Sequence, residues 1–253
     1  MSRGRYRART SAIGEIGRVL LPPAEDRHGP LASLMLALTF VAGVVDAASY
    51  LKLGHVFVAN MTGNVVFLGF ALAGAGGLSV ATSLVAIASF LLGALGGGWL
   101  GARKAEHRGR LLRASSAAQA GFILIALLGA VSVSEPLDSA VRYALVVPLA
   151  LAMGVHNAAA QRLAIPELTT TVLTKTLTGI ASEAGLVGGP GSQFGRRSVS
   201  VAAMLLGALA GALLVLHVSI PAALRSPRRS VPRGFDHDPD GASKPALCGG
   251  LMR

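Results

Sequence analysis

Long apolar runs alternate with short polar or charged segments along most of the chain. The runs cover roughly residues 31–51, 56–74, 79–101, 114–133, 139–160, 165–187 and 199–220. Each is close to the roughly 20 residues that an α-helix needs to cross a bilayer. Because backbone groups in lipid must be hydrogen-bonded within the chain, the pattern predicts an all-α fold, a polytopic transmembrane helical bundle of six to seven spans.

The second and sixth runs are more polar than the others. Run 56–74 contains Asn60, Thr62 and Asn64, whereas run 165–187 contains several threonines together with Lys175 and Glu183. Two structures fit this composition: a helix buried inside the bundle, or a broken, re-entrant segment that lines a cavity. The sequence leaves both open.

The composition excludes an ordinary soluble domain. Hydrophobic residues make up 52% of the chain and charged residues 14%, and the mean hydropathy is +0.60. The single cysteine, Cys248, excludes a disulfide scaffold. The net charge of +11 does not indicate nucleic-acid binding, because the basic residues flank apolar runs and no recognisable nucleic-acid-binding fold accompanies them. The expected partner is the lipid bilayer.

Most basic residues lie in three blocks, within residues 1–30, 103–113 and 225–253. Segments rich in Lys and Arg stay on the cytoplasmic side of a membrane. Six spans, with run 56–74 entering and leaving on one side, place all three blocks inside and separate the charges better than seven spans. This predicts an inner-membrane domain at 31–220 between a basic N-terminal segment (1–30) and a disordered basic tail (221–253), with both termini cytoplasmic.

Two parts of the chain resemble each other. Residues 43–48 (Gly-Val-Val-Asp-Ala-Ala) match residues 154–159 (Gly-Val-His-Asn-Ala-Ala), and a threonine-containing segment follows each. This predicts an internal repeat with units at about 31–101 and 139–220, joined by span 114–133. Such units are parallel with seven crossings and inverted with six; chance similarity between alanine-rich spans is the alternative. Both third runs carry small residues at a spacing of four, which allow close helix packing: Gly93, Gly97 and Gly101, and Gly207 and Gly211.

Polar side chains within the apolar runs are the candidate site. A carboxylate at the centre of a membrane helix costs about 2.5–3.5 kcal/mol on insertion scales, so Asp46 is expected to face protein or a cavity. It would serve either as a proton or cation site or as a structural carboxylate. Lys175 would pair with Asp46 or Glu183, or extend to the interface. The candidate substrate- or ion-binding residues are Asp46, Asn60, Thr62, Asn64, Asn157, Thr174 and Lys175.

These residues also carry a family resemblance. Residues 43–46, Phe57 and the Met-Thr-Gly-Asn block at 61–64, with residues 153–157 and the threonine cluster at 169–178, resemble the YoaK-like family. That family consists of bacterial multi-pass membrane proteins with a domain of unknown function. The resemblance covers roughly 31–220 and implies a membrane architecture without implying an activity. The chain departs from the family pattern at His156 and Lys175.

No catalytic motif accompanies this pattern. The histidines His55, His156 and His217 lie on different runs, so no metal site or cofactor is expected, and the chain is not expected to be an enzyme. The polar midplane residues favour a small-solute transporter or permease. The alternative is a non-transport membrane scaffold or regulatory protein, in which the same residues only fix helix packing. A water-accessible cavity bordered by Asp46 and Asn64 would favour transport. The oligomeric state stays open.

Overall fold

A computed structural model describes residue 17 and residues 31–104, 108–133, 137–163, 173–182 and 194–217. Within these residues the fold is all-α, a polytopic helical bundle, as the apolar runs predict. The chain divides into residues 1–219 and 220–253, and the second part, with Cys248 and the whole basic tail, lies outside the described residues.

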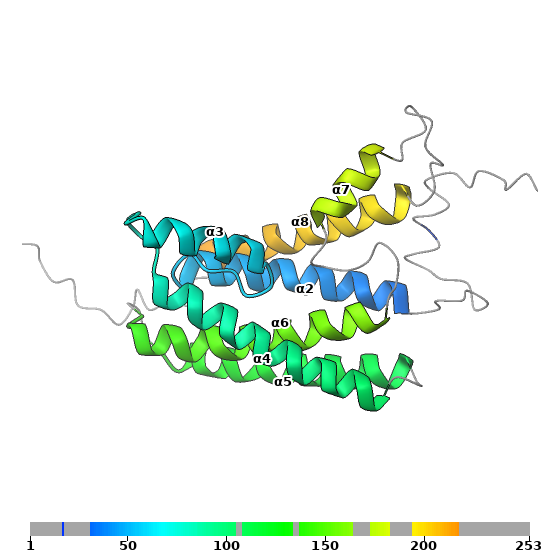
Figure 1. The fold of residues 1–253 in the computed structure, drawn as a ribbon, viewed down its shortest axis with the longest axis horizontal. Coiled ribbons are helices and arrows are strands. Elements are labelled where there is room, and N and C mark those ends of the chain that lie inside the picture. The colour runs from blue at the N-terminus through cyan, green and yellow to red at the C-terminus, as the bar shows by residue number, and fades with distance from the viewer. Residues whose placement is uncertain are drawn as a thin grey trace, which may run out of the picture. The chain divides into compact units, whose positions relative to one another are not determined.

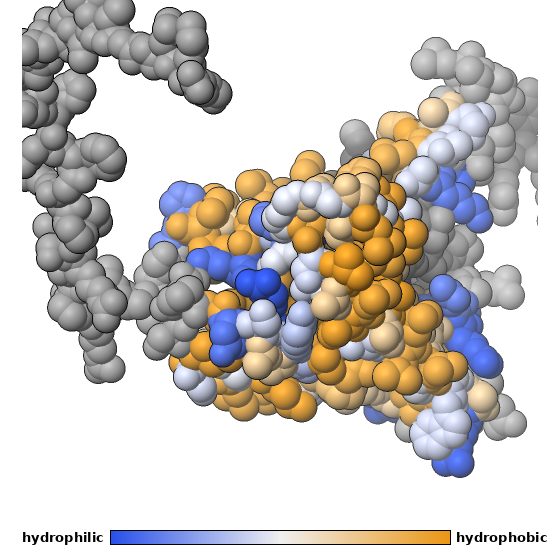
Figure 2. Space-filling view, turned by 60° about the vertical axis from the view of Figure 1, so that its left-hand side comes forward, coloured by the Kyte–Doolittle hydropathy of each residue, from blue (hydrophilic) through white to orange (hydrophobic). Residues whose placement is uncertain are grey.

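Among the described residues, five helices are long and apolar enough to cross a membrane. Three of the predicted spans match closely in extent. The five are α2 (Leu31–Lys52), α4 (Val80–Lys104), α5 (Arg108–Val131), α6 (Ser139–Leu163) and α8 (Phe194–His217). Figure 2 shows the result at the surface: hydrophobic residues cover most of the helices, and hydrophilic residues gather towards their two ends.

The two polar runs form shorter helices than a crossing requires. Helix α3 (Met61–Leu72) has 12 residues and follows an irregular segment at 53–60, and α7 (Leu173–Ser182) has 10. About 20 residues are needed to cross. Figure 1 shows α3 returning to the end of the bundle where α2 ends and α4 begins, so run 56–74 enters and leaves on one side. The rest of run 165–187 lies outside the described residues.

The long helices pack as two parallel pairs, α2 with α8 and α4 with α6 (Figure 1). Along the first pair, Gly207 lies against Phe40 and Gly211 against Val44; along the second, Gly97 lies against Val155. Residue numbers therefore rise together in each pair. Leu31 and His217 consequently lie at opposite ends of the bundle, whereas the six-span prediction places both flanking segments on one side.

We name the two ends of the bundle by the helix termini they hold. End A contains the first residues of α2, α5 and α8 and the last residues of α4 and α6. End B contains the opposite terminus of each of these five helices. A hydrophobic cluster near end A joins Met35 of α2, Leu112 of α5 and Leu163 of α6. Helix α6 is the central element, since 67% of its most apolar window is buried, against 17% in α5 and in α8.

The basic loop predicted at 103–113 is largely helical. Helix α4 continues to Lys104 and α5 begins at Arg108, so only residues 105–107, which lie outside the described residues, separate the two helices. Arginine side chains can extend from a helix end toward the headgroups, so a basic segment need not be a loop. Arg108 also donates a hydrogen bond to the Leu163 carbonyl, which ties the start of α5 to the end of α6.

A buried amide in α5 gives a first testable prediction. Gln119 is 2% exposed, and neither its amide oxygen nor its amide nitrogen has a hydrogen-bond partner among the described residues. A buried unsatisfied polar group costs about 1–3 kcal/mol. We therefore expect Gln119→Leu to raise the melting temperature of the purified protein, measured by the fluorescence of Trp99. Gln161→Leu, at an exposed position, is the control and should leave it unchanged. A lower melting temperature for Gln119→Leu would contradict the assignment.

Candidate functional site

Asp46 holds the irregular segment that precedes α3. Its carboxylate Oδ1 accepts hydrogen bonds from the backbone N–H groups of Val58 (2.9 Å) and Ala59 (2.7 Å). The side chain is 4% exposed. Asp46 lies six residues before the end of α2, which corresponds to about 9 Å along the helix axis. The carboxylate therefore satisfies backbone groups that are not part of a helix, inside the membrane-spanning region.

Asn64 holds the same segment from the other side. Its Oδ1 accepts a hydrogen bond from the Phe57 N–H (2.9 Å), and its Nδ2 donates to the Phe57 carbonyl (2.6 Å). Asn64 is fully buried. The Phe57 ring also stacks on Tyr50, with 5.1 Å between ring centroids. Together Asp46 and Asn64 satisfy the amides of three consecutive residues, which explains how a non-helical segment persists between two helices.

The backbone conformation at the start of this segment is unusual. Gly54 has φ +93° and His55 has φ +57°, the left-handed region. Glycine adopts it freely, whereas His55 is the one described non-glycine residue with a positive φ. The Arg142 side chain lies 3.1 Å from the place that a Cβ on Gly54 would occupy. The chain thus reverses direction at end B against α6, which sends residues 56–60 back into the bundle.

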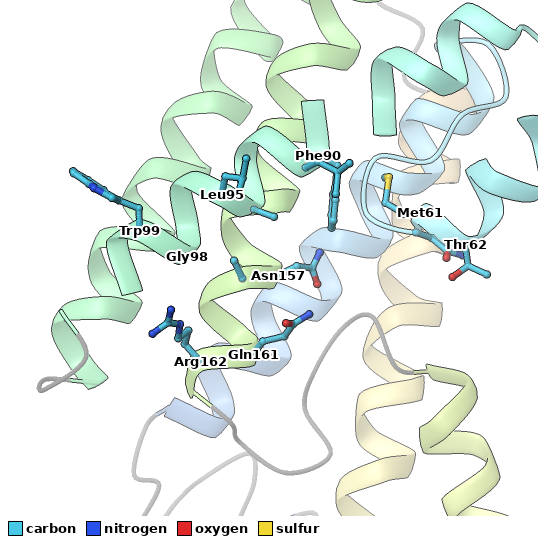
Figure 3. Close-up of a pocket in the computed structure, with 13 residues that line it drawn as sticks. Met61, Thr62, Phe90, Leu95, Gly98, Trp99, Asn157, Gln161 and Arg162 are labelled. Carbon is cyan, nitrogen blue, oxygen red and sulfur yellow. The ribbon is translucent and has the colours of Figure 1, made fainter. Parts of the chain in front are cut away.

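The first residues of α3 border a groove that α4 and α6 complete. Its volume is about 980 Å³. Figure 3 shows Asn157 and Gln161 projecting from α6 toward the side on which Met61 and Thr62 lie, with Phe90 and Trp99 on α4. Phe90 lies near the middle of α4, so the groove reaches from mid-bundle toward end A. The described lining residues are Asn60, Met61, Thr62, Phe90, Leu91, Ala94, Leu95, Gly98, Trp99, Asn157, Ala158, Gln161 and Arg162.

The structure separates the predicted site residues into two groups. Asn60, Thr62 and Asn157 line the groove, whereas Asp46 and Asn64 are buried in packing contacts and do not line it. Asn157 also donates a hydrogen bond from Nδ2 to the Met153 carbonyl (2.9 Å). Asp46 faces protein, as expected, and its described hydrogen-bond partners are backbone amides of the segment before α3. A cavity bordered by Asp46 and Asn64, which would have favoured transport, is not found among the described residues, and neither residue lines the groove.

The two candidates on α7 lie elsewhere. Thr174 and Lys175 are exposed and do not line the groove. The buried face of α7 contains Thr176 and Gly179, and Gly179 lies against the guanidinium of Arg197 on α8. The threonines at 169–171 and Glu183 lie outside the described residues.

Sequence reasoning missed the groove residues Gln161, Arg162, Phe90 and Trp99. One signal for Gln161 was present, because it follows Asn157 by four residues and so shares its helix face. Arg162 and Trp99 lie near span ends, where charged and aromatic residues are ordinary interface anchors.

The five predicted packing glycines lie in the two helix seams. A Cβ on Gly97 would lie 2.6 Å from the Val155 carbonyl oxygen, and one on Gly211 would lie 2.6 Å from the Val44 carbonyl oxygen. Gly93 lies against Leu151 and Gly207 against Phe40, and Gly101 faces the Arg162 side chain. No other residue allows backbones to approach this closely.

Comparison with known proteins places this architecture in a family. Residues 34–226 match the family model described as a protein of unknown function (DUF1275). The chain belongs to this family. It is also 35% identical over 157 residues to the UPF0700 transmembrane protein YoaK of Bacillus subtilis (strain 168). That match covers 60% of this chain and 66% of the relative, slightly less than two thirds of its length. No solved structure shows a significant match.

The DUF1275 match confirms the predicted resemblance and its membrane architecture. It includes all five long helices, the segment before α3 and the groove. Asp46 and residues 58–59 therefore lie within the part of the chain that matches the family model.

Proposed function

We propose that this protein is a small-solute transporter or permease of the inner membrane and that the groove is part of the solute path. One observation carries the proposal. Polar residues at the end of a re-entrant segment lie opposite polar side chains, although the rest of the bundle is apolar. Thr62 lies across the groove from Asn157 and Gln161 (Figure 3), and Asn60 also lines the groove. Non-helical backbone at membrane depth is tolerated where it is buried in protein or lines a water-filled cavity.

The proposal includes an internal inverted repeat, which the helix contacts support. Gly43 of α2 lies against Met204 and Ala208 of α8, and its sequence counterpart Gly154 of α6 lies against Phe90 and Ala94 of α4. Helices α2 and α6 run in opposite directions between ends A and B, as do α4 and α8. Each unit then contains two long helices with one short helix between them, and α5 joins the units. Inverted repeats of this kind are typical of secondary transporters.

The orientation of the bundle follows from its charges. Described basic residues are concentrated at end A, whereas Lys52 and Arg142 lie at end B. The positive-inside rule then makes end A cytoplasmic. Residues 103–113 would face the cytoplasm, as would residue 31, whereas His217 would lie at the outer face.

A non-transport scaffold is the second candidate, and one observation favours it. Asp46 Oδ1 and the Asn64 amide bond to the segment before α3 and do not line the groove, so these described contacts are structural. The buried Asp46 Oδ2 has no hydrogen-bond partner among the described residues. In a scaffold the groove would hold lipid or another protein instead of a solute. Transport measurements separate the two functions.

The test uses a variant that fills the groove without disturbing helix packing. Gly98 lines the groove, and a Cβ added there meets no heavy atom within 4 Å. Gly96 on the same helix is equally open but does not line the groove, so Gly96→Phe is the matched control for Gly98→Phe. Proteoliposomes are tested with a panel of small neutral, anionic and cationic solutes, by tracer uptake and by osmotic swelling.

We expect at least one solute to enter the proteoliposomes. Its rate should fall at least tenfold in Gly98→Phe and stay within twofold in Gly96→Phe, because only the first side chain occupies the path. Absence of uptake across the panel, or equal uptake by both variants, would refute the proposed path and favour a scaffold.

A further inference from the structure

The electrostatic character of the groove points to a class of solute, and this inference rests on the proposed function. Among the described lining residues the charged side chain is Arg162, and none carries a carboxylate. The other polar groups are amides and a hydroxyl, from Asn60, Thr62, Asn157 and Gln161. We propose that the groove accepts small organic anions with an apolar body, in preference to neutral or cationic solutes of the same size, and that Arg162 binds the anionic group.

Neighbouring residues fix the position of the Arg162 side chain. Its side-chain carbons lie against Gly101 of α4, where an added Cβ would be 3.1 Å from the Arg162 Cγ. The absence of a side chain at Gly101 therefore leaves the space through which Arg162 passes along α4. Figure 3 shows Arg162 at the end A side of the groove, projecting toward α4, whereas Gln161 projects toward the side on which Met61 and Thr62 lie. A guanidinium offers five N–H donors in a planar fork that matches a carboxylate or a sulfonate.

The charged side chains around the groove are also mainly positive. At end A lie Arg103, Arg108, Arg110, Arg113, Arg162, Arg196 and Arg197. The acidic side chains among the described residues are Asp46 and Asp138. Asp46 is buried and bonded to backbone amides outside the groove, and Asp138 lies at end B, where it caps α6. Charge of one sign around a cleft concentrates oppositely charged solutes at its mouth.

The apolar part of the groove lining indicates that the body of the solute is apolar. Phe90, Leu91, Leu95 and Trp99 of α4 contribute apolar side chains to the lining of the groove, in addition to the amides of α6. Trp99 is held by Arg103, whose guanidinium carbon lies 4.0 Å from the ring centroid. An apolar wall with a few convergent polar groups is typical of sites for organic molecules.

An anionic lipid would use the same arginine but fits the groove less well. Its acyl chain would lie against Asn60, Thr62 and Gln161, which would then have hydrocarbon where they could bond to a polar solute. Bound lipid is therefore an outcome of the test, to be distinguished from binding of a soluble anion.

The experiment uses probes whose charge does not change with pH. Proteoliposomes of the full chain are supplied with benzenesulfonate or with phenyltrimethylammonium, and xylitol serves as a neutral solute. The variants are Arg162→Gln and Arg162→Lys. Arg113→Gln removes a positive charge at the same end of the bundle from a residue that does not line the groove, and so controls for the general field.

We expect benzenesulfonate to enter at least tenfold faster than phenyltrimethylammonium. Its uptake should fall at least tenfold in Arg162→Gln, partly recover in Arg162→Lys and stay within threefold in Arg113→Gln. Entry of xylitol or the cation without the anion, blocked by Gly98→Phe, would overturn the anion inference and leave the proposed path intact. If neither the probes nor any solute of the panel enters the proteoliposomes, the proposed function itself is refuted. Anionic phospholipid that copurifies with the protein and is lost in Arg162→Gln, without benzenesulfonate uptake, would assign the groove to lipid and overturn the inference.

Discussion

Replacing Gly97 with leucine is expected to force α4 away from α6 and to destabilise the whole bundle. A Cβ at this position would already lie 2.6 Å from the Val155 carbonyl oxygen and 2.9 Å from the Val155 Cα. Backbone atoms cannot move aside as a flexible side chain can, so the helices must separate and lose van der Waals contact along the seam. We expect a loss of about 3 kcal/mol or more, at or above the top of the usual range for overpacking.

The matched control lies one residue earlier. Gly96 is on the same helix, has no heavy atom within 4 Å of an added Cβ and is exposed. Gly96→Leu should therefore keep the melting temperature and the elution volume of the purified protein close to those of the wild type. Gly211→Leu should reproduce the loss in the α2–α8 seam, where the Val44 carbonyl oxygen would be 2.6 Å from the Cβ. A stable, well-assembled Gly97→Leu protein would refute the packing described here.

The second large effect is expected from removing the Asp46 carboxylate. Asp46→Ala leaves the N–H groups of Val58 and Ala59 without their acceptor. Each buried unsatisfied donor costs about 1–3 kcal/mol, so the substitution should cost about 2–6 kcal/mol in stability. Asp46→Asn keeps an oxygen at Oδ1 and should cost less. Amide hydrogen exchange of residues 58 and 59 should accelerate strongly in the alanine variant and moderately in the asparagine variant.

Asp138→Ala provides the control for this experiment. Asp138 also accepts a backbone hydrogen bond, from Val141 at 2.7 Å, but it is exposed and caps the first turn of α6. Loss of such a cap costs about 1 kcal/mol. Asp138→Ala should leave amide hydrogen exchange at residues 58 and 59 unchanged. Unaltered exchange there in Asp46→Ala would show that Asp46 does not hold the segment.

The long helices could be predicted because hydrophobic length is set by the thickness of the bilayer. The burial of Asp46 followed from the cost of a carboxylate in hydrocarbon. The hydrogen-bond partners of Asp46 could not be predicted, because an amide N–H is present in every residue except proline and leaves no pattern in the sequence. The similarity of residues 43–48 and 154–159 makes Asn157 the sequence counterpart of Asp46, which does not identify the contacts of Asp46. The described partners of Asp46 instead lie on the next segment of its own chain.

The number of crossings could not be read from run length alone. Run 56–74 is long enough for a span, but its first part forms an irregular segment tied to Asp46 and Asn64, and only 12 residues are helical. The groove was equally hidden. Helix α6 contributes Asn157, Gln161 and Arg162, and these become one wall only when α4 packs against it through Gly93 and Gly97.

The most direct test of the account is whether water reaches the groove at the start of α3. Single cysteines at Thr62 and Gln161, in a Cys248→Ser background, are treated with a charged, water-soluble thiol reagent in proteoliposomes. Leu127, 58% exposed on the face of α5, provides the lipid-facing control. We expect Thr62→Cys and Gln161→Cys to react at least tenfold faster than Leu127→Cys. Gly98→Phe should slow the reaction at Thr62→Cys. Reaction at Thr62→Cys as slow as at Leu127→Cys would contradict a water-filled groove and, with it, the proposed solute path.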